Sequence, residues 1–68
     1  GDFAKAYEIF NRIPDNFRSR ADVGINFART AKNLGKKEEA VALLSNVKKV
    51  PSNYKNYYEE SRKKIEGN

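Results

Sequence analysis

The sequence predicts a single all-α domain built from antiparallel helical hairpins. Apolar residues recur every three or four positions, two prolines and an internal glycine divide the chain into segments of helical length, and no segment alternates apolar and polar residues as a β-strand does. A chain of 68 residues is long enough for one small domain with a thin core. We therefore expect one domain over residues 1–68. Its four expected helices cover about residues 2–13, 17–34, 37–49 and 54–66.

Apolar spacing and Pro14 define the first two expected helices. Phe3, Tyr7 and Phe10 recur at helical spacing in the first, and Pro14 ends it because proline cannot continue a helix. The two residues after Pro14, Asp15 and Asn16, are suitable N-caps for the second helix. The face expected to pack inward in that helix consists of Phe17, Ala21, Gly24, Phe27, Ala28, Ala31 and Leu34.

Gly35 and Pro51 bound the third expected helix. Gly35 suits the left-handed conformation that ends many helices, because it has no Cβ atom. Charged pairs in the first and last turns of residues 37–49 match the helix dipole, and they are Glu38, Glu39, Lys48 and Lys49. After Pro51, Ser52 or Asn53 is expected to cap the last helix. The aromatic and apolar residues of that helix are Tyr54, Tyr57, Tyr58 and Ile65.

An offset of 34 residues relates two parts of the chain. The pairs at this offset are Gly1 with Gly35, Ala6 with Ala40, Ile9 with Leu43, Phe10 with Leu44, and Ile13 with Val47. Each pair repeats a glycine, an alanine or a large apolar residue. Periods of about 20–50 residues are typical of helical repeat proteins, in which each unit buries its apolar face against its neighbours. The sequence therefore predicts a short helical repeat.

This pattern resembles the tetratricopeptide repeat family, which pairs two antiparallel helices in each 34-residue unit. The matching residues are Gly35, Ala40, Leu44, Val47 and Pro51 in one unit, Gly1, Ala6, Phe10, Ile13 and Pro14 in the other, and Phe27, Ala28 and Ala31 in the helix between them. The resemblance implies a superhelix fragment of about two units with small residues where helices cross. Gly24 departs from the family pattern, because the family usually has a large aromatic residue there.

The same resemblance implies a peptide-binding groove. Its candidate residues in this chain are Asp22, Ile25, Arg29, Lys32, Asn33, Asn56, Glu59, Lys63 and Glu66. Arg29, Lys32 and Asn33 lie three to four residues apart, so one helix face presents two cations and an amide. Such a face suits a carboxylate, although the same charges can also simply solvate an exposed helix. Ile25 replaces the lysine of family members that clamp a C-terminal carboxylate, so that clamp is not supported.

The last segment is interpreted as a closing helix of the repeat. Ser61 and Arg62 are expected on a polar outer face, with Tyr58 and Ile65 turned inward. The tyrosines at 54, 57 and 58 are also candidates for a partner interface, because tyrosine buries a large ring and keeps a polar tip. A structural role for this cluster is the favoured interpretation.

The composition argues against catalysis. The chain has no Cys and no His, which removes thiolate and imidazole groups as nucleophiles, bases and metal ligands. Ser45 and Ser61 have no histidine to activate them. The adjacent glutamates at 38–39 and at 59–60 point in different directions on a helix. We expect no enzymatic activity, no metal site and no cofactor.

Charge and hydropathy indicate the kind of partner. The net charge is +5, but no basic run exceeds two residues, which favours an acidic protein or peptide over nucleic acid. No stretch approaches the roughly 20 apolar residues of a membrane span, and no signal-like segment opens the chain, so we expect no membrane insertion. The sequence leaves the cellular compartment open.

The leading hypothesis is a protein–protein interaction module or scaffold with a mildly basic groove. One alternative is an RNA-binding helical repeat that resembles the pentatricopeptide family, since Gly35, Glu39 and Ala40 fit either family. Another alternative is a purely structural segment. In that case weak self-association is expected through a partly covered apolar end formed by Phe3, Tyr7 and Phe10.

Overall fold

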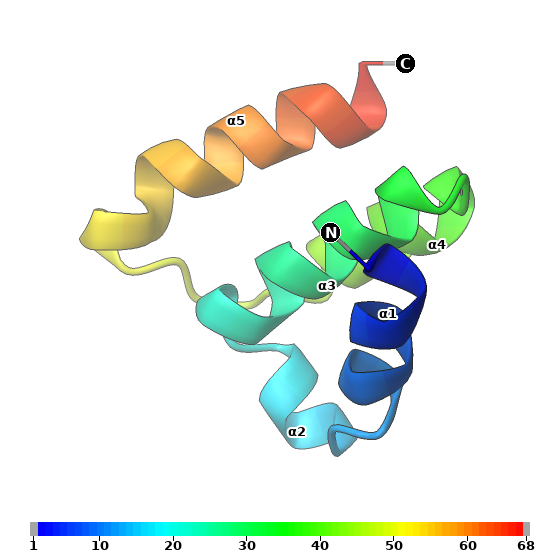
Figure 1. The fold of residues 1–68 in the computed structure, drawn as a ribbon. Coiled ribbons are helices and arrows are strands. Elements are labelled where there is room, and N and C mark those ends of the chain that lie inside the picture. Colours follow the sequence, from blue (N-terminus) through cyan, green and yellow to red (C-terminus); the bar gives the residue numbers. More distant parts are fainter. Residues whose placement is uncertain (1, 68) are drawn as a thin grey trace.

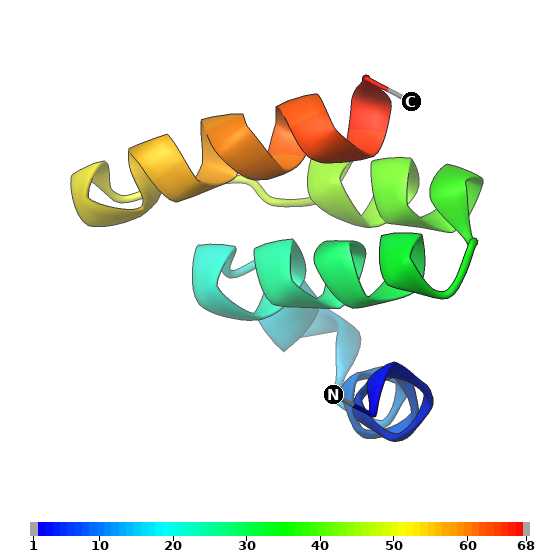
Figure 2. The same ribbon diagram turned by 45° about the horizontal axis from the view of Figure 1, so that its top comes forward.

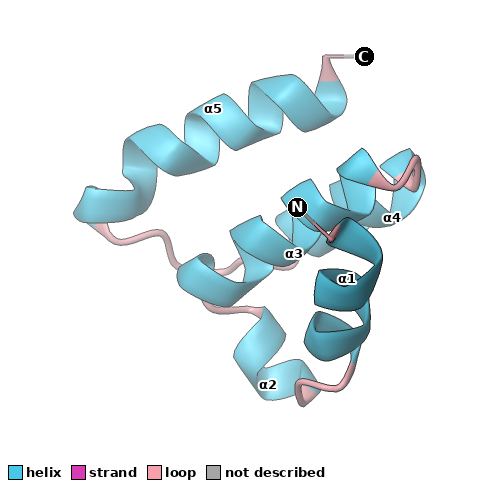
Figure 3. Ribbon diagram, in the orientation of Figure 1, coloured by secondary structure: helices cyan, strands magenta, loops and turns pink. Residues whose placement is uncertain are grey.

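The computed structural model of the chain describes residues 2–67 and confirms the all-α prediction. Within these residues the elements are α1 (Phe3–Asn11), α2 (Asp15–Arg18), α3 (Ala21–Asn33), α4 (Lys37–Ser45), the 3₁₀ helix η1 (Ser52–Tyr54) and α5 (Lys55–Glu66) (Figure 1). Short loops connect them (Figure 3). Gly1, which the 34-residue offset pairs with Gly35, lies outside the described residues.

Helices α3, α4 and α5 lie in one layered arrangement. α3 and α4 form an antiparallel hairpin, and α5 packs on both of them (Figure 2). α1 packs on another side of α3 and crosses it steeply, so that α1 is seen nearly end-on in Figure 2. An antiparallel hairpin is therefore present in α3 and α4, whereas α1 does not lie antiparallel to α3.

The core lies between α3, α4 and α5. Its buried apolar residues are Ala21, Ile25, Ala28, Ala31, Ala40, Leu44, Val47 and Ile65. Half of these are alanines, which lets the helix backbones approach closely. Phe27 is buried on the side of α3 that faces α1. The centre of its ring lies 5.3 Å from that of Phe10 and 5.5 Å from that of Tyr7, so aromatic packing holds α1 in place.

The single helix predicted at residues 17–34 is instead two helices, α2 and α3. α2 ends at Arg18 and α3 begins at Ala21, so the prediction of a continuous helix is wrong. The Arg18 side chain donates hydrogen bonds to the carbonyl oxygens of Asn11 at 2.6 Å and Ile13 at 3.0 Å. These bonds satisfy carbonyl groups at the end of α1 and hold α2 against it.

Phe17 and Leu34 were expected on the inward face of that helix but lie at the surface. Phe17 is 44% exposed and Leu34 is 36% exposed. Phe17 belongs to α2, which the break turns away from the face that α3 buries. Leu34 is the C-cap residue of α3, after the last turn that packs on the core. The prediction for Phe17 depended on one continuous helix, and the break removes that basis. The prediction for Leu34 assumed that the packed face of the helix reaches its last residue.

The helix predicted at residues 37–49 ends at Ser45. The chain beyond it leaves the helical conformation, and Lys49 forms an isolated parallel bridge with Arg20. Val50 stands directly before Pro51 and has a β-branched side chain. Its position before a proline and its β-branching both disfavour the helical conformation. The two lysines expected in the last turn therefore lie outside the helix. The predicted glutamate pair does occupy its first turn.

Gly35 ends α3 as predicted. Its φ of +80° is in the left-handed region. The Gly35 N–H donates to the Lys32 carbonyl at 3.0 Å, and the Lys36 N–H donates to the Ala31 carbonyl at 2.9 Å. These two bonds form a Schellman motif, which satisfies the last carbonyl groups of the helix. The resulting turn sends α4 back along α3.

The N-caps predicted for the later helices make no capping hydrogen bond. Pro14 is the N-cap residue of α2, Asp15 is already inside it, and η1 covers Ser52–Tyr54 without a side-chain cap. Asp2 does cap α1, because its carboxylate accepts a hydrogen bond from the Lys5 N–H at 3.0 Å.

Candidate functional site

Polar side chains join α3 to α5 where the two helices meet. The Tyr57 hydroxyl donates a hydrogen bond to Asn26 Oδ1 at 2.6 Å. About one turn further along, Arg29 Nη1 donates to Ser61 Oγ at 3.1 Å, and the guanidinium carbon lies 5.0 Å from the centre of the Tyr57 ring. The negative face of the ring attracts the cation. These contacts fix the rotation of α5 relative to α3.

A hollow of about 240 Å³ lies beside these contacts, towards the C-terminal ends of both helices. Its lining residues are Arg29, Lys32 and Asn33 from α3 and Lys64 and Ile65 from α5. We call it the α3–α5 hollow. The three residues from α3 are those whose spacing places them on one helix face, and the structure brings Lys64 to them.

Among residues 2–67, the lining of the α3–α5 hollow has three cations and no acidic side chain. Arg29 is held by Ser61 and Tyr57, and its planar guanidinium has further N–H donors. Asn33 Nδ2 donates to the Arg29 carbonyl at 2.9 Å, which orients the amide. Cations gathered around one concave site create a positive potential, which an anionic group such as a carboxylate neutralises with charge-assisted hydrogen bonds.

Two sequence candidates on α3 lie away from this hollow. Asp22 is in the first turn, where its two carboxylate oxygens accept hydrogen bonds from Arg20, both at 3.3 Å. Ile25 has 0% exposure and belongs to the core, so its assignment to a groove is wrong. The resemblance to tetratricopeptide repeats had assigned Ile25 to the open face of α3, but this residue faces α4 and α5.

The candidates on α5 are placed at a different surface. Asn56 is exposed, and Glu59 and Lys63 line another hollow with Arg62 and Glu66. Arg62 Nε and Glu66 Oε1 are 3.2 Å apart, and this hydrogen bond, together with the charge of Glu66, raises the pKa of Arg62. These residues therefore balance one another's charge instead of adding to the cations of the α3–α5 hollow.

Ser61 corrects the expected orientation of the closing helix. It was expected on a polar outer face, but it has 0% exposure and accepts the hydrogen bond from Arg29. A serine at this position leaves room for α3 to approach, and its hydroxyl is satisfied inside the contact. Sequence reasoning missed Lys64, because its choice of Lys63 assumed another rotation of α5.

Residues 2–67 contain neither a metal-binding cluster nor a membrane-spanning helix. No three acidic side chains in this part come together where they could hold a metal ion. No helix in it has the length and apolar character needed to cross a membrane.

We compared the chain with models of protein families, with characterised proteins and with solved structures, and none of the three comparisons gave a match. The functional assignment therefore depends on the geometry of the site.

Proposed function

We propose that the chain is a protein–protein interaction module that binds an acidic peptide segment at the α3–α5 hollow. The observation that carries this proposal is that Arg29, Lys32 and Lys64 meet at one hollow, to which the described part of the chain contributes no acidic side chain. Holding like charges close together is unfavourable, and a bound carboxylate relieves this repulsion. An acidic segment therefore gains both attraction and relief of the repulsion among the cations.

The three cations have different parts in the proposed binding. Arg29 is already ordered by Ser61 and Tyr57, so its binding to a carboxylate costs little additional side-chain entropy. Lys32 and Lys64 each add a compact positive charge on a long side chain, which suits a second acidic group. Ile65, which also lines the hollow, is 1% exposed and belongs to the core, so the polar side chains present the surface available to a ligand.

The proposal includes the tetratricopeptide-like interpretation of the fold as a hypothesis. Three features support it: the turn at Gly35, the buried alanines between α3 and α4, and the packing of α5 on that hairpin. All three belong to α3, α4 and α5, since α1 crosses α3 in another direction (Figure 2).

Charge reversal of Lys32 and Lys64 tests the site. Arg29 is less suitable, because its substitution also removes the contacts that hold α5. With the peptide acetyl-Asp-Glu-Asp-Glu-amide, we expect Lys32→Glu with Lys64→Glu to weaken binding about tenfold or more, a change of about 1.4 kcal/mol. Isothermal titration calorimetry measures the affinity, and circular dichroism checks that helicity is unchanged.

Two controls define the outcome. Lys37→Glu with Lys55→Glu makes the same change in net charge at other exposed positions and should leave the affinity within about twofold, since distant exposed charges are screened. The neutral peptide acetyl-Asn-Gln-Asn-Gln-amide should not bind. Equal losses in both double variants would contradict the site. Tighter binding of a single-stranded RNA, with a steep salt dependence, would favour the RNA-binding alternative.

A further inference from the structure

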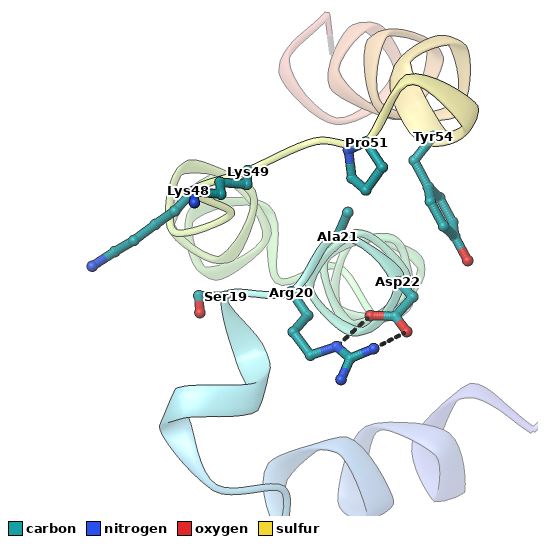
Figure 4. Close-up of a pocket in the computed structure, with 8 residues that line it drawn as sticks. All are labelled: Ser19, Arg20, Ala21, Asp22, Lys48, Lys49, Pro51 and Tyr54. Atoms are coloured by element: carbon teal, nitrogen blue, oxygen red, sulfur yellow. Dashed lines mark hydrogen bonds and ion pairs between the residues drawn. The ribbon is translucent and has the colours of Figure 1, made fainter.

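A further hollow, of about 370 Å³, lies at the end of α3 opposite the α3–α5 hollow. Its lining residues are Ser19, Arg20, Ala21, Asp22, Lys48, Lys49, Pro51 and Tyr54 (Figure 4). We call it the loop-end hollow. It is formed where the break before α3, the segment after α4 and the 3₁₀ helix η1 meet.

Two departures from regular helix create the loop-end hollow. The chain is extended at Arg20, before α3, and it is again non-helical after Ser45. The two segments lie against each other, because the Lys48 N–H donates to the Ser19 carbonyl at 3.3 Å and Arg20 forms a parallel bridge with Lys49. Had the predicted helices at 17–34 and 37–49 been continuous, these segments would not meet in this way.

The inner surface of the loop-end hollow is apolar. Ala21 lies at its centre with its methyl group directed towards the Pro51 ring (Figure 4). Tyr54 forms a side wall, and its half-buried ring packs against the core. An apolar pocket of this kind suits an aliphatic or aromatic side chain, because burial of apolar surface drives its insertion.

The charges around this hollow are unevenly placed. On one side, Arg20 and Asp22 neutralise each other through two hydrogen bonds, both at 3.3 Å (Figure 4). On another side are Lys48 and Lys49, both exposed, whose side chains form no ion pair within residues 2–67. Lys48 extends away from the hollow (Figure 4). The rim is therefore positive on one side, and the positive charge continues beyond the hollow.

We propose that the loop-end hollow binds a peptide segment in which one large apolar side chain is followed by acidic residues. The apolar side chain enters between Pro51 and Tyr54, and the acidic residues lie along Lys49 and Lys48. A free phosphate fits less well, because the inner surface is apolar and the Arg20 guanidinium is engaged by Asp22. The row of two lysines leading outward favours a ligand that continues as a chain.

An NMR titration of the intact chain with acetyl-Gly-Leu-Asp-Glu-amide tests this proposal. We expect amide shifts to concentrate at Ala21, Lys49 and Tyr54. Replacing the leucine of the peptide by alanine should weaken binding about fivefold or more, and replacing its acids by Asn and Gln should have a similar effect. Shifts spread evenly over all exposed lysines would overturn the proposal.

Protein variants separate this hollow from the first one. Lys48→Gln with Lys49→Gln should weaken binding of the leucine peptide about fivefold, whereas Lys37→Gln with Lys55→Gln should not change it. Pro51→Ser removes an apolar wall at an exposed position and should also weaken binding. Lys32→Glu with Lys64→Glu should leave the peptide-induced shifts at Ala21, Lys49 and Tyr54 in place, so the two proposals fail independently. Displacement of the peptide by inorganic phosphate at equal concentration would also overturn the proposal.

Discussion

Gly24 and Gly35 are both glycines for structural reasons, but the reasons differ. Gly24 is buried in α3, and a Cβ atom there would lie 2.6 Å from the Arg18 carbonyl oxygen and 2.6 Å from Val47 Cγ2. Its absence therefore lets α2 and the segment after α4 approach α3. Gly35 has no atom near its Cβ position, and what it needs is a φ of +80°. In the sequence, Gly24 was expected on the inward face and was otherwise only a departure from the family pattern.

Alanine substitutions separate these two reasons. Gly24→Ala gains up to about 1 kcal/mol of helix propensity but forces a Cβ into backbone and side-chain atoms, and such overpacking costs about 1–3 kcal/mol. Subtracting the full gain from this cost leaves a net loss of up to about 2 kcal/mol in the free energy of unfolding, measured by urea denaturation. Gly35→Ala should cost about 1 kcal/mol through backbone strain alone. A Gly24→Ala variant more stable than the original chain would contradict the close approach.

At the scale of the elements, the sequence predicts where helices lie better than where they end. The apolar period located every long helix, because it reflects which face is buried. The break at residues 19–20 contains no proline or glycine and depends on Arg18 reaching the carbonyl groups of α1, a tertiary contact. The early end of α4 did have a local signal, since a valine stands before Pro51.

In the candidate site, too, residues that share one helix face were predictable from the sequence, and residues brought in by tertiary contacts were not. Spacing alone grouped Arg29, Lys32 and Asn33, because residues three and four apart share a helix face. It could not supply Lys64, since the rotation of α5 about its axis depends on the buried Ser61 and its contact with Arg29. The loop-end hollow also depends on tertiary contacts, because it forms only where the non-helical segments before α3 and after α4 come together. The sequence therefore did not predict it.

A hydrogen bond between α1 and α4 gives a pH-dependent prediction. The Tyr7 hydroxyl donates to Glu39 Oε1 at 2.6 Å, and this bond, with burial and the charge of Glu39, raises the pKa of Tyr7. A raised pKa means that the folded state favours neutral tyrosine. The stabilisation is therefore complete below the unfolded pKa of about 10, and it is lost as pH rises through the higher folded pKa.

The Tyr7→Phe variant isolates this effect. It should lower the free energy of unfolding by about 1 kcal/mol at pH 7, because it removes a hydrogen bond to a carboxylate. Above pH 10 or so the difference between the two proteins should shrink, since the original chain then loses the same bond. Chemical denaturation at several pH values measures the difference. A constant difference up to pH 11 or so would contradict the assignment.

At the scale of the whole molecule, the apolar surface is concentrated on the N-terminal side. Phe3 is 42% exposed, Ile9 is 57% exposed, and Phe17 on the neighbouring α2 is also exposed. Tyr7 and Phe10, which were expected to form an open end with Phe3, are half-buried against Phe27. Of the three residues expected at the open end, Phe3 is exposed as predicted, and Ile9 and Phe17 are exposed in place of Tyr7 and Phe10.

This surface is the basis for a prediction of weak self-association. Exposed apolar residues on adjacent helices gain free energy when a second copy covers them, but a small patch supports only a dissociation constant on the order of 1 mM, about −4 kcal/mol. Sedimentation equilibrium at increasing concentration should show a rising apparent mass. Phe3→Ser with Ile9→Ser should suppress the rise, because it removes the apolar contact, whereas Lys37→Gln with Lys55→Gln should not. A monomer mass at every concentration would show that α1 stays uncovered in solution and that the three exposed residues do not form an interface.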